Sequence, residues 1–511
     1  MGRAAWSRRG VGALVVVFGI VLAPAVVRGQ VVPIFPGTPA QTETAPAAGE
    51  RPKGPQQPPG PVTPPGAQTP AAPGAQPVDP FAGSPLLRMF EPELEASAPL
   101  RQSRYAPTPE PGLPFNVRLF LTAEEEFTDN ADQTRTNRKS EFNTRIVPGI
   151  AIGAERPWAN LALSYAPQIF IENNTVGDTE VNQSLSARAA LWPGGRFQLN
   201  IADDFTDSND FRDQQDPGSR VTGTNQFTTN TVTAEAAYAL PRLKTALAYT
   251  NTVHQTDVGF SDTRVTHSVR PSVDYTDPRF GISGSYTVTR GDENSSIEIP
   301  YWLHRGETRF SYALTPVVSA VVTGSYEYEE PDAGAHFSDG RGLVGGTLTL
   351  GPDGSLTLLA GVSTFSTQDR GTKVRPSESL TYTHRFAAVA VSARYEEGYE
   401  NRSGAVDSTG VTFTRSAGIF VTTTALLFRQ LTGTLGVRWT EEKFEQTSTF
   451  GGPPGTKDRT WDIDVSIRYL LARAVSIDLG YTATIRTSTQ DSAEFHENRV
   501  RLGLRYEYTL F

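Results

Sequence analysis

The sequence predicts an all-β protein, a large antiparallel transmembrane β-barrel of about 16 to 20 strands preceded by a disordered Pro-rich segment. Three observations support this fold class. From Phe115 to Phe511, apolar and polar side chains alternate in segments of about ten residues or more, the period of strands with one apolar face. Such segments can cross a bilayer as tilted strands, whereas strands of soluble sheets are usually shorter. Tight turns and longer polar loops also follow one another in alternation, as in outer-membrane barrels.

The composition excludes several classes of protein. The 511 residues include no Cys, which excludes a disulfide framework, a thiolate metal site and a cysteine nucleophile. The formal net charge of −9 argues against nucleic acid as a partner, since phosphate neutralisation needs a concentrated basic face. A mean hydropathy of −0.34 excludes a polytopic helical membrane protein, but a membrane barrel presents only every second residue to lipid.

Residues 1–30 have the composition of a secretory signal peptide. Arg3, Arg8 and Arg9 precede the apolar run 11–22, and small residues follow before Gln30. The run is short for a membrane-spanning helix and is followed by Pro24. Cleavage after residue 25 or after residue 29 fits equally well. Export without any Cys predicts a bacterial envelope protein, and the barrel pattern predicts the outer membrane.

Residues 31–114 are rich in Pro, Ala, Gly, Gln and Thr, with proline pairs at 58–59 and 64–65. They offer too little apolar surface to offset the entropy of ordering, so we expect a disordered periplasmic segment. Two roles remain open for it, a plain linker and a docking strip for a partner. The apolar patch 81–90 is the part suited to a contact.

The predicted barrel occupies residues 115–511. In its first segment, Leu119 and Leu121 belong to the apolar face and Arg118 and Glu124 to the polar face. Aromatic residues near segment ends predict interfacial girdles, with Trp158 and Trp192 at one rim and Tyr326, Tyr328, Tyr395 and Tyr399 at the other. The expected tight turns are 192–195, 240–242, 277–279, 315–316 and 351–354, and the expected long loops are 129–139, 207–225, 292–304, 331–340 and 447–458.

The end of the chain resembles the C-terminal signal that outer-membrane barrels present to their assembly machinery, because an alternating last strand ends in Phe511. The apolar series that contains Val500, Leu502 and Leu504 is one residue out of step with Phe511. Either a bulge precedes the end or Phe511 does not take the usual position.

Residues 122–130, 140–143 and 146–150 resemble the start of the putative β-barrel porin-2 family, and the similarity continues through 161–171 and 197–207. That family includes outer-membrane barrels found in exopolysaccharide loci. The resemblance implies an outer-membrane barrel with a role in polysaccharide export or secretion. It implies no catalytic residues.

If the apolar face meets lipid, the charged residues of the other face line the lumen. Arg and carboxylate side chains on neighbouring strands lie within reach of cross-strand pairing. Opposed charged rows predict a hydrated pore that biases which ions or sugar polymers pass, although mixed charges could also brace a plugged lumen. The lumen-lining candidates are Arg118, Glu124, Arg145, Arg264, Arg270, Arg309, Arg394, Arg438, Asp462, Asp464, Arg468, Asp478, Arg486, Arg499, Arg501 and Arg505.

Catalytic and metal sites are poorly supported. A rim hydrolase needs His beside Ser or Asp, and the best match is the segment with His336, Ser338 and Asp339, where a solvated loop His is the simpler interpretation. The acidic group Asp203, Asp204, Asp207 and Asp210 could bind calcium or could be solvated charges. We therefore expect no enzyme activity, no cofactor and no resident metal.

The sequence thus predicts an outer-membrane porin that passes hydrophilic solutes or exopolysaccharide through a charged lumen. The alternative is a non-conducting structural or assembly barrel of an envelope or secretion complex. Expected partners are outer-membrane lipid and lipopolysaccharide, the assembly machinery through the strand ending at Phe511, and a polysaccharide or secretion complex. A soluble β-solenoid is the alternative fold.

Overall fold

The computed structural model describes residues 115–131, 133–172, 179–208, 226–257, 261–293, 300–332, 336–367, 371–401, 411–423, 430–444, 455–489 and 494–510. All of them belong to the compact unit Ala75–Phe511. The expected signal peptide, the expected Pro-rich segment and Phe511 lie outside the described residues.

The described residues form strands joined by turns and loops. The strands are β1 (Asn116–Thr128), β2 (Glu141–Arg156), β3 (Ala159–Tyr165), β4 (Gln168–Glu172), β5 (Thr179–Leu191), β6 (Phe197–Ser208), β7 (Gln226–Ala239), β8 (Leu243–Asp257), β9 (Ser261–Thr276), β10 (Phe280–Glu293), β11 (Tyr301–Ala313), β12 (Val318–Pro331), β13 (Phe337–Thr349), β14 (Gly354–Thr367), β15 (Gly371–Arg385), β16 (Val389–Asn401), β17 (Val411–Thr423), β18 (Leu431–Phe444), β19 (Lys457–Ala472), β20 (Val475–Ser488) and β21 (Phe495–Thr509). No helix among these residues is long and apolar enough to cross a membrane.

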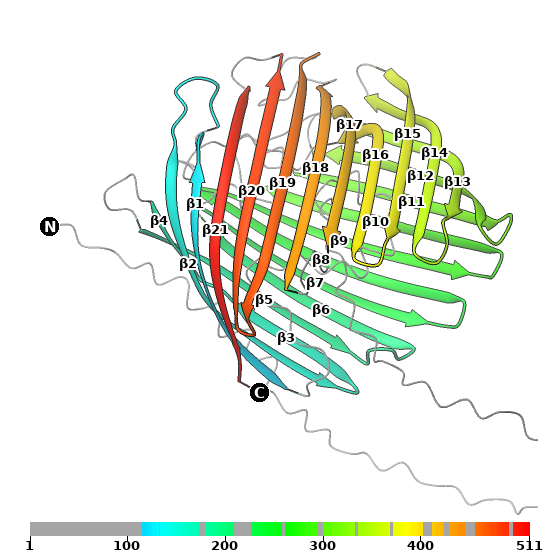
Figure 1. Ribbon diagram of the computed structural model, residues 1–511. Helices are drawn as coiled ribbons and strands as arrows, with labels where there is room; N and C mark the ends of the chain where they lie inside the picture. Colours follow the sequence, from blue (N-terminus) through cyan, green and yellow to red (C-terminus); the bar gives the residue numbers. More distant parts are fainter. Residues whose placement is uncertain are drawn as a thin grey trace, which may run out of the picture. The chain divides into compact units, whose positions relative to one another are not determined.

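The sheet closes on itself as an antiparallel barrel (Figure 1). Neighbours in the chain pair antiparallel, and β1 pairs with β21 from Arg118 opposite Thr509 to Thr128 opposite Arg499 without a register shift. This closure removes both sheet edges, which is the physical requirement for a sheet that crosses a bilayer. The closed antiparallel order excludes the β-solenoid.

Two of the 21 strand segments form a single barrel strand. Both β3 and β4 pair with β2 on one side and with β5 on the other. At the break, the shared register brings Pro148 of β2 opposite Pro167, and neither residue has an N–H to donate to the ladder. The barrel therefore has 20 strands, which confirms the predicted fold class and the upper limit of the predicted count.

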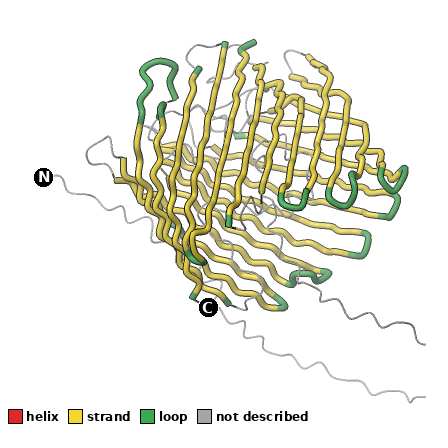
Figure 2. Tube along the Cα trace, in the orientation of Figure 1, coloured by secondary structure: helices red, strands yellow, loops and turns green. Residues whose placement is uncertain are grey.

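The connections differ between the two ends of the barrel (Figure 2). The predicted tight turns, such as those at 192–195 and 351–354, join strands at the end where β1 begins and β21 ends, called here the turn end. Gly194 and Gly351 have φ values of 77° and 76°, which L side chains rarely adopt. The longer connections, including 129–140, lie at the opposite end, the loop end.

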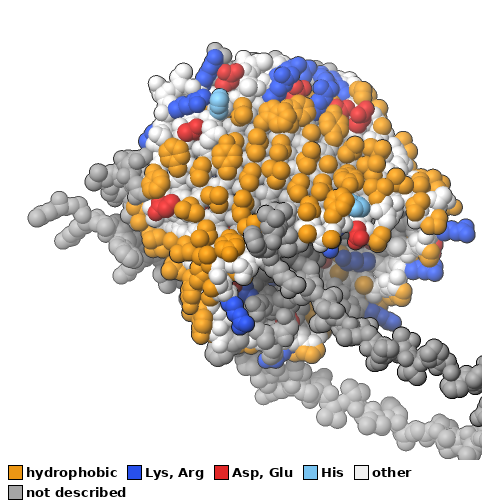
Figure 3. Space-filling view, viewed as in Figure 1, with side chains coloured by type: hydrophobic (Ala, Val, Ile, Leu, Met, Phe, Trp, Pro, Cys, Tyr) orange, Lys and Arg blue, Asp and Glu red, His pale blue; other side chains and the backbone are white. Residues whose placement is uncertain are grey.

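Apolar and polar side chains occupy opposite faces of the sheet. In β1, Leu119 and Leu121 are exposed, whereas Thr122 and Glu126 are buried. Directly opposed residues of paired strands share a face, so the register extends this assignment around the barrel. Figure 3 shows the outer surface, where apolar side chains form a broad band. The band takes the place of a central apolar core and is the surface that lipid can cover.

The inner face contains small apolar clusters among its polar side chains. One consists of Phe120, Val147 and Ala166, and its aromatic ring lies directly over Gly149. A Cβ on Gly149 would lie 2.1 Å from Cζ of Phe120, so this close approach requires glycine. A second cluster joins Val321, Leu343 and Leu359 on β12, β13 and β14.

Aromatic side chains occur near both rims of the outer band. At the turn end Trp192 packs on Phe197 with ring centroids 5.6 Å apart, and Trp158 is exposed. Towards the loop end Tyr326 is exposed. The girdle prediction is wrong for Tyr399, which is 2% exposed. Its position in a displaced part of the wall, described below, explains the burial.

Candidate functional site

The structure places all sixteen predicted lumen residues on one face of the sheet. Directly opposed residues of adjacent strands lie on the same face. When the register is followed from β1 to each neighbouring strand in turn, every one of the sixteen lies on the face of the buried polar residues of β1. For example, Arg118 of β1 shares this face with Glu507, its hydrogen-bonded neighbour on β21. The apolar band lies on the opposite face. The charged residues therefore point to the barrel interior.

One group of these residues forms a ladder of ion pairs on β18 to β21 and β1, called here the ladder wall. Arg118 Nη1 lies 2.6 Å from Glu507 Oε1, and Arg505 Nη2 lies 3.1 Å from Glu507 Oε2. On the next strands Arg468 pairs with its directly opposed residue Asp478. Positive and negative side chains thus alternate across neighbouring strands.

The ladder wall continues towards the loop end with carboxylates held by Arg and Thr. Asp464 and Asp462 accept hydrogen bonds from Thr482 and Thr484, at 2.9 and 3.0 Å. Further hydrogen bonds and ion pairs join Arg486 to Asp458, Arg499 to Glu497 and Arg501 to Thr482. Of the sixteen predicted residues, nine lie on β18 to β21, and Arg118 and Glu124 lie on β1.

Exposure of the ladder wall changes along the barrel axis. Near the loop end, the side chain of Asp458 is 1% exposed. Nearer the turn end, the side chains of Arg468 and Asp478 are 52% and 29% exposed. The ladder wall is therefore enclosed near the loop end and accessible to solvent at Arg468 and Asp478, whereas Arg118 and Arg505, also near the turn end, are only 9% and 11% exposed.

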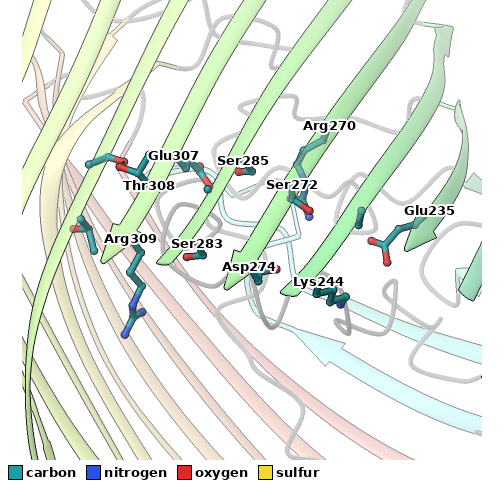
Figure 4. A pocket seen from close by; sticks show the side chains of 14 residues that line it. Glu235, Lys244, Arg270, Ser272, Asp274, Ser283, Ser285, Glu307, Thr308 and Arg309 are labelled. Atoms are coloured by element: carbon teal, nitrogen blue, oxygen red, sulfur yellow. The ribbon is translucent and has the colours of Figure 1, made fainter. Parts of the chain in front are cut away.

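A second charged region lines a hollow in the wall from β7 to β12 (Figure 4). Arg270 and Arg309, two of the predicted residues, alternate there with the carboxylates of Asp274 and Glu307. Serine hydroxyls from β9 and β10 lie between them. A surface of this kind offers both donors and acceptors to a polyhydroxylated solute.

The wall departs from regular pairing between β15 and β16. These strands pair only from Ser379 opposite Glu396 to Arg385 opposite Ala390, whereas β14 remains paired with β15 up to Gly371. Pro376, which has no N–H, lies three residues beyond Ser379, the last residue of β15 that pairs with β16. The loop-end part of β16 therefore leaves its neighbour.

The released part of β16 packs against the inner face of β13 to β15. We call this region of β13 to β16 the displaced wall. The backbone N–H of Tyr399 donates to Ser363 Oγ of β14 at 3.0 Å, which bypasses β15. Its ring packs against Phe365 and Phe413, with centroids 5.6 and 5.2 Å away. Arg375 donates to the Tyr399 hydroxyl at 3.1 Å. These contacts bury Tyr399 inside the barrel wall.

A buried ion pair holds the displaced wall. Arg341 of β13 lies 2.7 Å from Glu396 of β16 and donates to Ser377 Oγ of β15 at 2.8 Å. Side-chain exposure is 3% for Arg341 and 0% for Glu396. Arg394, one of the predicted residues, lies 3.6 Å from the other carboxylate oxygen of Glu396.

Arg341 and Glu396 are not among the sixteen residues predicted from the sequence to line the lumen. Their positions in the polar phase of β13 and β16 are the signal that could have found them. Their pairing could not be predicted, because two strands separate them in the sheet and ordinary cross-strand contacts join adjacent strands.

Two carboxyl groups outside the strands are held in the charged state. Burial raises the pKa of Asp129, but hydrogen bonds from the backbone and side chain of Asn498, both 2.7 Å, keep the pKa below its ordinary value. The Arg290 guanidinium donates to both oxygens of Asp332 at 2.7 and 2.8 Å and lowers the pKa of that carboxyl. The first contact ties the β1–β2 loop to β21 at the closing seam.

The weak catalytic and calcium candidates do not converge. His336 stacks on Tyr328, and Ser338 and Asp339, being consecutive in β13, point to opposite faces. In β6, Asp203 and Asp204 likewise point to opposite faces, and Asp204 pairs with Arg188 at 3.5 Å. Asp210 lies outside the described residues. Within the part of the chain that the structure describes, no group of three or more His or carboxylate side chains is placed to hold a metal.

Comparisons with known proteins agree with this architecture. The family model described as putative beta-barrel porin 2 matches residues 401–508. The expected resemblance is confirmed, with the match in the last strands rather than in the N-terminal hairpins that suggested it. No curated protein matches the chain.

Solved structures of bacterial outer-membrane proteins match this chain, and the match with a TM-score of 0.50 shows a shared fold. The FrpB iron transporter from Neisseria meningitidis (F3-3 variant) is 9% identical with a TM-score of 0.50, and the match covers 78% of this chain and 82% of that one. The outer membrane protein opdK from Pseudomonas aeruginosa is 12% identical with a TM-score of 0.36, over 77% of this chain and 98% of that one. OccK2 (OpdF) from the same organism, in a complex with glucuronate, is 8% identical with a TM-score of 0.39, over 78% and 98%.

Proposed function

We propose that this outer-membrane β-barrel, which resembles porins, is a channel that passes hydrophilic solutes through its charged lumen. The main support for this proposal is the ladder wall, where the opposed side chains of Arg468 and Asp478 are exposed to the interior. A closed barrel of 20 strands lies between porins of 16–18 strands, which enclose an aqueous channel, and transporters of 22 strands, whose lumen is plugged. Opposed charges across a hydrated lumen order water and discriminate among ions.

The proposed solutes are small hydrophilic molecules or an acidic exopolysaccharide. The abundance of Arg on the inner face favours a negatively charged polymer, and the interleaved carboxylates limit how tightly it binds. Release must stay fast for passage, so a wall that offers many weak contacts suits a polymer better than one strong site. We further propose export through the N-terminal signal peptide, insertion by the assembly machinery through the last strand, and no enzymatic role.

The test is conductance of the full-length protein in planar bilayers, with ion selectivity measured in asymmetric salt. We expect steady conductance, a shift towards cation selectivity in Arg468→Gln, and the opposite shift in Asp478→Asn, because each change leaves the opposed charge in excess. Arg290→Gln and Glu125→Gln make the same charge changes on the outer face and serve as controls. Blockade by acidic but not neutral oligosaccharides would support a polysaccharide as the solute.

The competing function is a non-conducting structural or assembly barrel. The displaced wall favours it, since packed side chains such as Arg341 and Tyr399 occupy the inner face there. A folded protein that inserts but never conducts, with heat-modifiable gel migration as proof of folding, would overturn the channel and favour this second function.

A further inference from the structure

The outer face of β18 and β19 carries three successive cross-strand pairs whose character changes towards the loop end. Trp439 lies opposite Trp461, with ring centroids 6.4 Å apart. One step nearer the loop end, Glu441 lies opposite Arg459. One step further, Lys443 lies opposite Lys457.

The middle pair belongs to a chain of alternating charges across four strands. Arg415 of β17 lies 3.0 Å from Glu397 of β16 and 3.5 Å from Glu441 of β18. Arg459 of β19 lies 2.6 Å from the other oxygen of Glu441. The side chains of Arg415 and Arg459 remain 44% and 56% exposed. Each guanidinium therefore keeps donors that face solvent.

The lysine pair adds positive charge just beyond this chain. Among the residues that the structure describes here, the group contains four basic side chains and the carboxylates of Glu397 and Glu441. Figure 3 shows basic side chains gathered at the loop-end edge of the apolar band, over β18 and β19. We call Arg415, Lys443, Lys457 and Arg459 the basic rim.

The basic rim lies directly above a surface suited to lipid. Trp461 is 46% exposed, and apolar side chains including Leu435, Ile467 and Leu479 continue below it towards the turn end. Trp prefers the boundary between headgroups and hydrocarbon. The order from turn end to loop end is therefore apolar, aromatic and cationic, which matches acyl chains, boundary and headgroup of a lipid.

We propose that the basic rim binds the phosphate groups of a lipid headgroup in the outer leaflet, while Trp439, Trp461 and the apolar surface below contact its acyl chains. Arg and Lys donors form strong charge-assisted hydrogen bonds with phosphate oxygens. A lipid fits better than a free anion, because the rim lies on the outer, bilayer-facing surface and not in the lumen. This inference requires the barrel to lie in a membrane and does not depend on conduction.

The test compares lipid binding by the full-length protein in detergent, using native mass spectrometry. The probes are bis-phosphorylated lipid A, the same lipid without its phosphates, and inorganic phosphate. In K443Q/K457Q we expect about tenfold weaker binding of the phosphorylated lipid, which corresponds to about 1.4 kcal/mol. K443R/K457R should bind like the wild type. The matched control is R242Q/R279Q, which removes the same charge at the turn end.

Three outcomes would overturn the proposal. Equal binding of phosphorylated and dephosphorylated lipid would remove the role of phosphate. Equal losses in K443Q/K457Q and R242Q/R279Q would reduce the effect to net charge. Displacement of the lipid by an equimolar amount of inorganic phosphate would make a free anion the ligand. Unchanged heat-modifiable migration of each variant shows that the barrel has folded, and conductance measured in parallel tests the channel separately.

Discussion

The exposed pair of the ladder wall and the buried pair of the displaced wall are built from the same residue types and differ in their access to water. In the ladder wall, Arg468 and Asp478 are opposed on adjacent strands and are partly exposed to the interior. In the displaced wall, Arg341 and Glu396 bridge over two intervening strands and are almost fully buried. Solvent screens the first pair and leaves its charges available to a solute. The second pair has lost its hydration, so each charge depends on the other.

The difference teaches that charge on the inner face is not by itself evidence of a pore. An exposed ion pair contributes little to stability but shapes the field in the lumen. A buried pair contributes little to that field and determines where β16 lies. In the proposed channel we therefore expect the ladder wall to govern selectivity, whereas the displaced wall fixes the position of the β16–β17 hairpin.

The largest expected effect comes from removing one member of the buried pair. Glu396→Ala should destabilise the barrel by about 3 to 5 kcal/mol, because the positive charge of Arg341 remains buried without its nearest carboxylate. The measurement is urea-induced unfolding in lipid vesicles, followed by tryptophan fluorescence. Asp478→Ala is the control, since Asp478 and its partner Arg468 are 29% and 52% exposed, and its loss should cost less than about 1 kcal/mol. Equal losses in the two variants would contradict the distinction between the walls.

A smaller effect is expected when both members of the buried pair are replaced by apolar residues of similar size. Arg341→Met/Glu396→Leu should recover at least half of the stability lost in the worse single variant, because no unpaired member of the pair remains. The coupling energy from a full double-mutant cycle measures this recovery. The same cycle with Arg468→Met and Asp478→Leu should give a coupling below about 1 kcal/mol, since that pair is partly solvated. A larger coupling there would reverse the comparison.

The smallest effect concerns pH and the seam beside the ladder wall. The folded pKa of Asp129 is lowered, so its contact with Asn498 adds stability above the unfolded-state pKa of about 3.9. This contribution is lost as pH falls through the lower, folded pKa. Because Asp129 is partly exposed, we expect Asp129→Asn to cost less than about 1 kcal/mol at pH 6. The cost should shrink at pH 3, and a difference that stays constant across this range would argue against the carboxylate as its source.

Much of the fold could be predicted, because strands in a membrane obey a local rule. Lipid on one side and water on the other impose a period of two, which assigned Leu119 to the outer face and Arg118 to the inner face. Turn residues such as Gly194 and Gly351 marked the turn end for the same local reason, a backbone conformation that favours glycine. The face of every candidate lumen residue followed from this period.

By itself, then, the sequence determined that long strands form a barrel, which face the candidate lumen residues take and at which end the short turns lie. The strand bounds were less well determined, since β11 and β13 begin at Tyr301 and Phe337, inside the expected loops 292–304 and 331–340. Only the tertiary structure decided that β3 and β4 share one barrel strand, that Tyr399 leaves the girdle, and that Arg341 reaches Glu396. The physical reason is the range of the interactions. Alternation and turn chemistry act between neighbours in the chain, whereas closure of the barrel and the inward packing of β16 depend on contacts across the sheet that no local pattern encodes.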